Sequence, residues 1–440
     1  MRLSLLLPLT VVCALSSAQS KYDTLTDAMA QKGLNELGAY HLLEELSGGI
    51  GPRLSGSPSA AKAVEWGQTT MKRLGFQNVH LVPCMVPHWV RGDKESLDII
   101  SSDGSAMPLS CCALGMSYAS PDGGVTAEVV EVHSLDEASK LGDKAKGKIV
   151  FYNGPMPAQL TNTFGAYGAA GGQRFRGPVT AARLGAVGAI VRSMTLALDD
   201  FPHTGVTEFG PADPKIPAVA VSLVAADRLH DELQKGSVTV KLVTHCQVLP
   251  DEPSANVVGE IVGSEKPNEV IVMGGHLDSW DLGRGAHDDG AGIVQSLEAL
   301  RLLHDLGWKP KRTIRVVLWM NEENGGRGAD AYVEYAKKAT EKHIAGMESD
   351  SGGFAPRGFG VSLQAKKAKS LDKWLPALSK FEIERFYPGG EGGADVDGLA
   401  DVHAVVFGLA PESQRYFDYH HSDKDTIDKV NPRELELGAM

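Results

Sequence analysis

The sequence predicts an α/β fold. Unbroken apolar runs of strand length, such as Val270–Met273, alternate with helix-length amphipathic segments, as in a sheet buried on both faces. Glycine is abundant, at 50 of 440 residues, which suits many tight strand-to-helix turns. With 42% hydrophobic residues, the chain can bury a substantial core and is long enough for two domains.

Residues 1–18 resemble a signal peptide. Met1-Arg2 precedes an apolar run, and Ser16-Ser17-Ala18 is a small-residue cleavage pattern. A membrane anchor is the alternative, but the run is interrupted at Pro8 and is too short to span a bilayer comfortably. We therefore expect a secreted or periplasmic protein whose mature chain has no membrane span.

The segment that follows the signal peptide is expected to be helical at first. Two helices are predicted over Asp27–Leu46, ended by Ser47-Gly48-Gly49, and over Ala60–Leu74, ended by Gly75. An alternating strand is predicted over Val79–Val86. Residues 19–117 thus form the first part of the main domain, with room for a short prosegment.

Residues 118–246 differ in their sequence pattern from the flanking segments, which indicates a self-contained inserted module. Short apolar strands are predicted at 148–152, 189–191 and 216–221. The Gly-rich segment 165–177 is predicted to be a mobile loop, followed by a helix through Ala181 and Leu184.

From about residue 254 the strand–helix alternation is regular. A helix is predicted from about Gly290, a strand over 313–319, a helix over 329–338 and a strand over 344–347. In such sheets ligands bind where strands end and helices begin. His276, Glu322, Glu323 and Asp350 all fall at such ends.

The chain carries five motifs of metal-ligand types in order. They are Gly275-His276-Leu277-Asp278, His287-Asp288-Asp289-Gly290, Asn321-Glu322-Glu323-Asn324, Glu348-Ser349-Asp350 and His420-His421-Ser422. Two histidines and three carboxylates are what two adjacent divalent ions need, and one further carboxylate can act as a base. The set indicates a hydrolase.

Each motif alone has an ordinary explanation. One of Asp288 and Asp289 can cap a helix, and the Glu322-Glu323 pair can be a solvated turn. Glu348 competes with Asp350, and only one of His420 and His421 need bind metal. Asp278 lies two residues from His276 and can orient its imidazole.

Other chemistries find little support. A net charge of -12 without a basic tract argues against a nucleic-acid partner. The Gly-rich segments 165–177 and 389–393 do not match a phosphate loop, and the second is expected to border the substrate cleft. The cysteines after the leader (Cys84, Cys111, Cys112 and Cys246) are as consistent with free thiols as with disulfides.

These motifs together resemble the co-catalytic zinc aminopeptidase and carboxypeptidase family. Gly51-Pro52-Arg53 and Gly390-Glu391-Gly392 extend the likeness over nearly the whole chain. The resemblance implies a zinc-peptidase mixed sheet flanked by helices, interrupted at about 118–246 by a protease-associated domain. Residues 247–440 would be the metal-binding part of the peptidase domain, C-terminally truncated because family members continue further.

The resemblance also implies the roles at the site. Two Zn²⁺ ions are expected, bridged by Asp288, one also held by His276 and Asp350 and the other by Glu323 and His421. His421 is preferred to His420 because family members place this ligand four residues before an Asp-Thr pair, here Asp425-Thr426. His420 is then a candidate for stabilising the oxyanion.

The expected activity is hydrolysis of dipeptides, or of the terminal residue of short peptides, by a metal-activated bridging water with Glu322 as general base. A homodimer is expected. The alternatives are a single-zinc glutaminyl cyclase, or a non-catalytic receptor or scaffold on the same fold.

Overall fold

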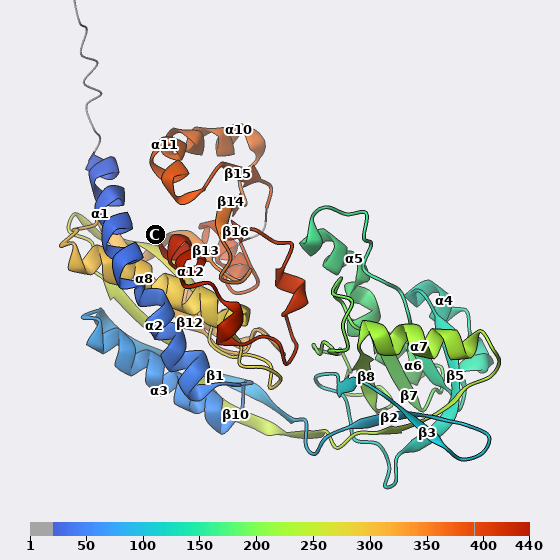
Figure 1. The fold of residues 1–440 in the computed structure, drawn as a ribbon. Coiled ribbons are helices and arrows are strands. Elements are labelled where there is room, and N and C mark those ends of the chain that lie inside the picture. The colour runs from blue at the N-terminus through green and yellow to red at the C-terminus, as the bar shows by residue number, and fades with distance from the viewer. Residues whose placement is uncertain (1–20, 391) are drawn as a thin grey trace, which may run out of the picture.

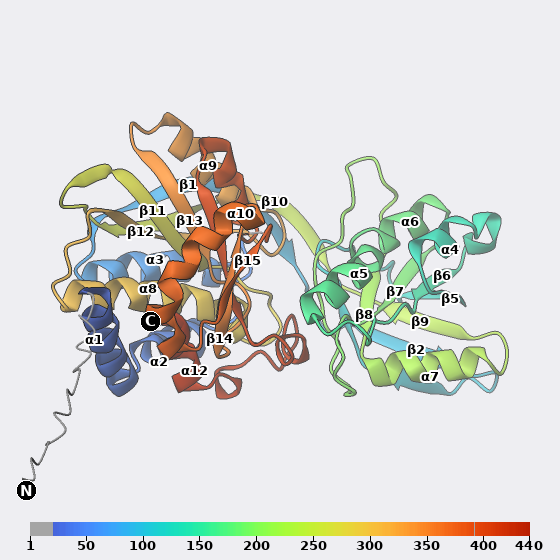
Figure 2. The same cartoon turned by 90° about the horizontal axis from the view of Figure 1, so that it is seen from above.

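The computed structural model describes residues 21–390 and 392–440, so the expected signal peptide lies outside the described residues. Within them the chain forms two lobes, each built on an eight-stranded sheet. The main lobe comprises residues 21–90 and 247–440, and the inserted lobe comprises residues 91–246 (Figure 1). The lobes lie side by side, joined by the long strands β1 and β10 (Figure 2). None of the described helices has the length and apolar character needed to cross a bilayer.

The main sheet is mixed, with parallel strands at its centre. Its strands, in spatial order, are β1 (Gln77–Val90), β10 (Gln247–Ile261), β12 (Arg312–Trp319), β11 (Lys266–His276), β13 (Lys342–Glu348), β16 (Val405–Pro411), β14 (Pro356–Val361) and β15 (Arg385–Pro388). Strands β12, β11, β13 and β16 run parallel, whereas β10 and β14 flank them antiparallel. The carboxyl ends of the four central strands therefore meet at one edge.

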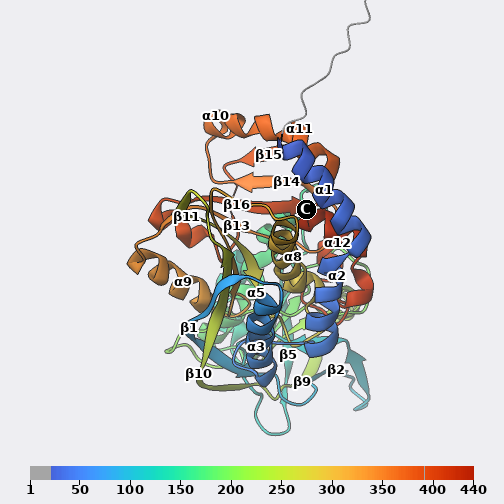
Figure 3. The same ribbon diagram turned by 90° about the vertical axis from the view of Figure 1, so that its left-hand side faces the viewer.

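Helices cover both faces of this sheet (Figure 3). The helices of the main lobe are α1 (Lys21–Glu36), α2 (Gly38–Leu43), α3 (Pro58–Arg73), α8 (Ala291–Asp305), α9 (Arg327–Lys338), α10 (Ala365–Ala368), α11 (Leu375–Leu378) and α12 (Pro432–Ala439). Along β12, Val316 and Leu318 pack beneath α2, α3, α8 and α12, and the alternate residues Val317 and Trp319 pack against α9. Both faces are buried because side chains alternate across a strand, which explains the unbroken apolar sequence.

The inserted lobe repeats this layered design on a smaller scale. Its strands, in spatial order, are β3 (Ala106–Leu109), β2 (Ser96–Ile100), β9 (Thr239–Val243), β5 (Val125–Val132), β6 (Ile149–Tyr152), β7 (Gly188–Arg192), β8 (Ala218–Val221) and β4 (Cys111–Ala113). Its helices are α4 (Leu135–Ser139), α5 (Thr163–Phe175), α6 (Gly177–Arg183) and α7 (Leu223–Leu233). In β6, Ile149 and Phe151 face α7, while Val150 and Tyr152 face α4 and α6.

The structure differs from the sequence-based expectations at three places. Strands β2, β3 and β4 belong to the second sheet, so this lobe begins before residue 118. The segment 165–177, predicted as a loop, is largely the helix α5, whose first turn is capped by the Asn162 side chain. The single helix expected over 27–46 is broken at Leu37, which adopts a left-handed conformation with φ of 50°. The four described cysteines are free thiols.

Candidate metal centre

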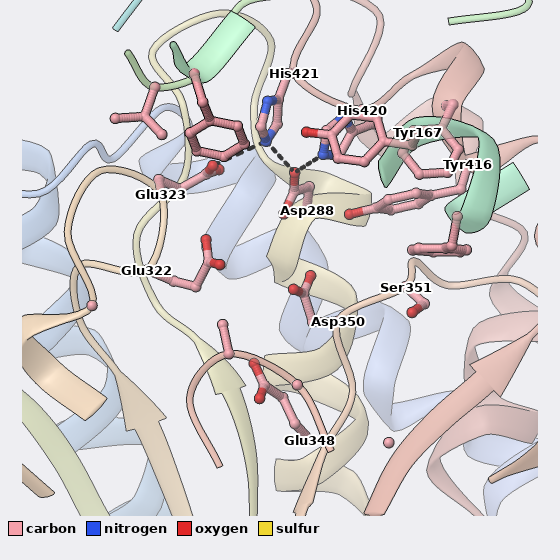
Figure 4. A pocket seen from close by; sticks show the side chains of 18 of the residues that line it. Tyr167, Asp288, Glu322, Glu323, Glu348, Asp350, Ser351, Tyr416, His420 and His421 are labelled. Carbon is pink, nitrogen blue, oxygen red and sulfur yellow. Dashed lines mark ion pairs between the residues drawn. The ribbon is translucent and has the colours of Figure 1, made fainter. Parts of the chain in front are cut away.

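Three neighbouring parallel strands deliver the candidate ligands to one edge of the main sheet. His276 is the last residue of β11, Glu322 and Glu323 follow β12, and Asp350 follows β13. Asp288 lies in the turn before α8. Figure 4 shows five of the six predicted metal and base residues converging in one cleft: Asp288, Glu322, Glu323, Asp350 and His421.

Asp288 lies at the centre of the cluster. Its Oδ1 is 3.1 Å from Nε2 of His276, and its Oδ2 is 3.1 Å from Nε2 of His421. Asp350 Oδ1 lies 3.6 Å from the same nitrogen of His276. The two carboxylate oxygens of Asp288 thus face two different imidazoles, which is the arrangement expected of a carboxylate that bridges two cations.

Two compact groups of potential ligands result, and they share Asp288. One is His276, Asp288 and Asp350, the set that the family resemblance implies for one ion, and the other is Asp288, His420 and His421. Glu323 is not in the second group, although its Oε2 is 3.0 Å from His421 Nε2. His420 Nε2 lies 3.5 Å from Asp288 Oδ2, so the structure brings His420 closer to the ligand position than expected.

Hydrogen bonds at the other ring nitrogens direct Nε2 of both imidazoles toward the cluster. Nδ1 of His276 is 3.0 Å from the carbonyl oxygen of Asp278, and Nδ1 of His421 is 3.3 Å from that of Thr204. A carbonyl only accepts, so Nδ1 carries a proton and Nε2 is the nitrogen that can bind a metal ion. Two imidazole nitrogens gathered with carboxylate oxygens in a buried place form a donor set that fits divalent metal ions.

Unpartnered oxygens support the same conclusion. Asp288 Oδ2 and Asp350 Oδ1 are buried and have no hydrogen-bond partner among the described residues. Buried carboxylates of this kind are destabilising unless a cation or a donor compensates them.

Asp278 was expected to orient the His276 imidazole through its carboxylate, but it does so through its backbone carbonyl. Its backbone carbonyl, and not its carboxylate, accepts from His276, since the carboxylate Oδ1 lies 3.9 Å from the ring. That Oδ1 instead accepts from the N–H groups of Asn321 at 2.7 Å and Glu322 at 3.1 Å. Asp278 thereby ties the Glu322–Glu323 turn to the end of β11.

The alternatives for Asp289 and Glu348 are resolved by their contacts. Asp289 accepts from the N–H of Gly292 at the start of α8 and from the N–H of His276, which accounts for it as a capping residue. Glu348 Oε2 accepts from the N–H groups of Asp395 and Val396, and Glu348 belongs to neither ligand group. It holds the backbone of residues 395–396, which follow the second Gly-rich segment.

Electrostatics favour positive charge at the cluster. Burial alone would raise the pKa of Asp288, but the imidazoles of His276 and His421 hold it well below its usual range. Burial alone would lower the pKa of His276, yet Asp288 and Asp350 raise it well above its usual value. Perturbed groups gathered in a cleft are typical of a functional site.

Glu322 and Glu323 are adjacent in sequence but lie in different environments. Burial and the nearby Asp288 carboxylate raise the pKa of Glu323 to about 7, against the opposing effect of His421. Burial raises the pKa of Glu322 well above its usual value, assisted by Asp350 and Glu323. Glu322 has no imidazole within ion-pair distance among the described residues, and it is partly exposed to the cleft.

The cleft has a volume of about 1400 Å³ and is lined by both lobes. The inserted lobe contributes Tyr167 and Arg174 from α5, residues that the sequence did not single out. Tyr416 is buried with its hydroxyl directed toward Asp288 and Asp350 (Figure 4). Gly392 and Gly393 line the opposite wall, as expected for the second Gly-rich segment.

Sequence reasoning could have found Tyr416 and Asp425, but not Arg174. Tyr416 lies one helical turn before His420, and Asp425 accepts from the N–H groups of His287 and Asp288 and so shapes the ligand turn. Arg174 comes from a distant part of the chain, and no local pattern links it to the ligands.

Comparison with known proteins identifies relatives over most of the chain. The pattern of peptidase family M28 matches residues 256–438. Carboxypeptidase Q from Bos taurus is 36% identical, covering 91% of this chain and 83% of that protein. Carboxypeptidase Q from Xenopus laevis is 36% identical, covering 89% of this chain and 81% of that protein.

Solved structures show the same relationship. A peptidase M28 precursor from Shewanella amazonensis superposes with a TM-score of 0.90 at 33% identity, over 95% of this chain and 94% of that one. A zinc aminopeptidase from Bacillus subtilis superposes with a TM-score of 0.61 at 18% identity, covering 91% of this chain and 93% of that one, which shows a shared fold.

Proposed function

Because this chain is a metallo-exopeptidase of peptidase family M28, we propose that it hydrolyses dipeptides or the terminal residue of short peptides, with two zinc ions and Glu322 as general base. The observation that carries the proposal is the placement of Asp288 between two imidazoles, with one carboxylate oxygen facing each.

In this proposal Asp288 would be shared by the two ions. His276 and Asp350 would complete one site, and His421 with Glu323 would complete the other, for which His420 is the competing ligand. When bound, the ions supply Lewis-acid activation of water and of the scissile carbonyl.

Glu322 performs the proton transfer. It lies beside the cluster, is partly exposed to the cleft and belongs to neither ligand group, so its carboxylate can accept a proton from water. The same group then returns the proton to the leaving amine, as a general base that becomes a general acid does. Burial and the neighbouring carboxylates give it a high proton affinity, which suits this role.

Arg174 supports a substrate with a free carboxylate. Its guanidinium lines the cleft, is 4% exposed and donates to the Tyr167 hydroxyl at 2.6 Å. Among the described residues Arg174 forms no ion pair with a carboxylate, and its Nε has no hydrogen-bond partner. A buried guanidinium without an anion is a fitting partner for the C-terminal carboxylate of a short peptide.

The remaining expectations are part of the same proposal. We propose that the inserted lobe is a protease-associated domain, that residues 1–18 direct export, and that two chains form a homodimer. The layered fold of the inserted lobe and the signal-like sequence of residues 1–18 support the first two. The homodimer rests on the family resemblance alone.

Metal counting and product analysis test the proposed function. Mass spectrometry of the folded protein should find two zinc ions per chain, and free dipeptides should be cleaved in a chelator-sensitive way. Comparing free dipeptides with N-blocked and C-amidated ones shows which terminus is recognised. One zinc per chain would favour the cyclase, and no chelator-sensitive cleavage of any peptide would favour the scaffold.

A further inference from the structure

His421 adopts an uncommon backbone conformation and is held there by the inserted lobe. Its φ is 60°, in the left-handed region that non-glycine residues rarely occupy. Two hydrogen bonds join it to Thr204, since the Thr204 N–H donates to the His421 carbonyl at 2.9 Å and the His421 ring Nδ1 lies 3.3 Å from the Thr204 carbonyl. Such conformations persist where the surroundings fix them.

The neighbouring His203 makes a third hydrogen bond from the inserted lobe, to the residue that precedes His421. Its Nδ1 lies 2.6 Å from the carbonyl oxygen of His420, so Nδ1 carries the proton and donates. The side chain is 3% exposed and its Nε2 has no partner among the described residues. The donation to His420 is therefore the one polar contact that the described residues offer this ring.

The segment around His203 is itself fixed within the inserted lobe. The His203 N–H donates to Ser193 Oγ at 2.8 Å, and Thr204 Oγ1 donates to the Ala113 carbonyl at 2.8 Å. The Gly115 N–H donates to the Gly205 carbonyl at 2.9 Å. The hydrogen bonds to His420 and His421 thus start from a rigid support and not from a free loop.

We propose that His203 and Thr204 make the inserted lobe a structural part of the metal centre, with His203 as a positioning residue that sets the orientation of the His421 imidazole. This inference rests on the proposed function in one respect, because it assumes that His421 binds zinc. A partner on the other ring nitrogen of a metal-binding histidine, here the Thr204 carbonyl, commonly contributes about 10- to 100-fold to metal affinity, and His203 holds the backbone of the same turn at His420.

Variants of His203 test the proposal by zinc affinity, measured in competition with a chromophoric chelator on the full chain. His203→Phe keeps the ring volume but cannot donate, and it should weaken one of the two zinc sites by about tenfold or more. His203→Asn, whose amide N–H can replace the Nδ1 donor, should restore the affinity. His230→Ala, which removes an imidazole on α7 that pairs with Glu131, is the matched control and should leave both sites unchanged.

Cobalt substitution supplies a readout that a packing defect alone would not move. The visible absorption of the cobalt-loaded protein should change in His203→Phe and return to the wild-type spectrum in His203→Asn. Thermal unfolding in excess chelator compares the folds without metal, and His203→Leu replaces the Phe variant where that variant does not fold.

The outcomes separate the two claims. Wild-type zinc affinity in a folded His203→Phe variant would overturn the positioning role. If the wild-type protein binds a single zinc, the two-metal function fails, but a weaker affinity for that ion in His203→Phe that Asn restores would still uphold the positioning role. A loss that Asn does not restore would reduce His203 to a packing residue.

Discussion

At the scale of single residues, the adjacent carboxylates Glu322 and Glu323 differ because of what faces them. Glu323 Oε2 lies 3.0 Å from His421, whereas Glu322 is directed into the cleft below Asp288 (Figure 4). The backbone of this turn is held by Asp278, whose carboxylate accepts hydrogen bonds from the N–H groups of Asn321 and Glu322. One residue of difference in sequence therefore separates the proposed ligand from the proposed base.

Replacing Glu322 by glutamine should lower kcat by at least about a hundredfold and leave zinc bound, because the amide cannot accept the proton from water. Steady-state kinetics on a free dipeptide, with zinc counted in the same sample, measures both quantities. Glu334→Gln on the exposed face of α9 is the control and should keep full activity. Wild-type kcat in the Glu322 variant would remove this residue from the proton transfer.

Replacing Arg174 by glutamine should affect only substrates with a free C-terminal carboxylate. A lost charge-assisted hydrogen bond is equivalent to about 1.5–3 kcal/mol, or roughly a 10- to 100-fold rise in KM. The KM for the matching C-terminal amide should stay constant. Arg176→Gln is a close control, because Arg176 is exposed beside Glu208. Equal effects on acid and amide substrates would show that Arg174 acts only through packing.

At the scale of elements, the sequence predicted strand ends better than it predicted the inserted lobe. The central strands β11, β12 and β13 were located within a few residues, because strands buried on both faces are apolar without interruption. Those ends place His276, Glu323 and Asp350 together, so most of the site followed from the sequence and the family resemblance.

The helix α5 was missed because its stability comes from elsewhere in the chain. Its glycines argue for a loop, but Phe164 and Tyr167 stack on Tyr416 and Phe417 of the main lobe with centroid separations of 5.3 Å and 4.6 Å. Packing between distant segments overrides local propensity here. For the same reason Arg174, which this helix carries into the cleft, could not be predicted.

The contact between α8, α12 and α2 contains a carboxyl group that should respond to pH. Glu436 of α12 is fully buried and accepts from the N–H of Ala39 at 3.1 Å. Burial, together with Glu298 of α8, raises its pKa to about 8. Glu298 accepts two hydrogen bonds from Arg301, at 2.6 Å each.

Glu436 should therefore make the fold less stable as pH rises. Its pKa is raised from 4.5 to about 8 in the folded state, so between these values the folded chain binds a proton that the unfolded chain releases. The free energy of unfolding then falls with pH across this window. Glu436→Gln should be more stable than the wild type at pH 8, by on the order of a few kcal/mol, and equally stable near pH 5.

Urea unfolding of both proteins at pH 5 and pH 8 measures the difference. Glu65→Gln, at an exposed position of α3, is the control and should give no pH-dependent difference. A constant difference between wild type and Glu436→Gln at the two pH values would contradict the assignment of the proton.

At the scale of the whole molecule, the two lobes meet at the candidate metal centre and not only at the connecting strands. Besides the bonds from Thr204 and His203, Lys424 of the main lobe pairs with Asp199 at 2.6 Å, and Arg91 pairs with Asp281 at 2.6 Å. Tyr167 also packs edge-on against His420 at a centroid separation of 5.1 Å. These contacts surround the His420–His421 turn, so cations bound there should stabilise both lobes.

Zinc loading should accordingly raise the stability of the entire chain. Ions that bind the folded state alone add about 2.7 kcal/mol to the free energy of unfolding when free zinc is 100 times the dissociation constant. Thermal unfolding in zinc-buffered and chelator solutions measures the shift, and hydrogen exchange should show slower exchange at residues 203–207 when zinc is present. Asp288→Ala removes the shared carboxylate and should abolish both effects. If zinc raised the unfolding midpoint but left exchange at residues 203–207 unchanged, the stabilisation would be confined to the main lobe. The hydrogen bonds between Thr204 and His421 would then not couple zinc binding to the stability of the inserted lobe.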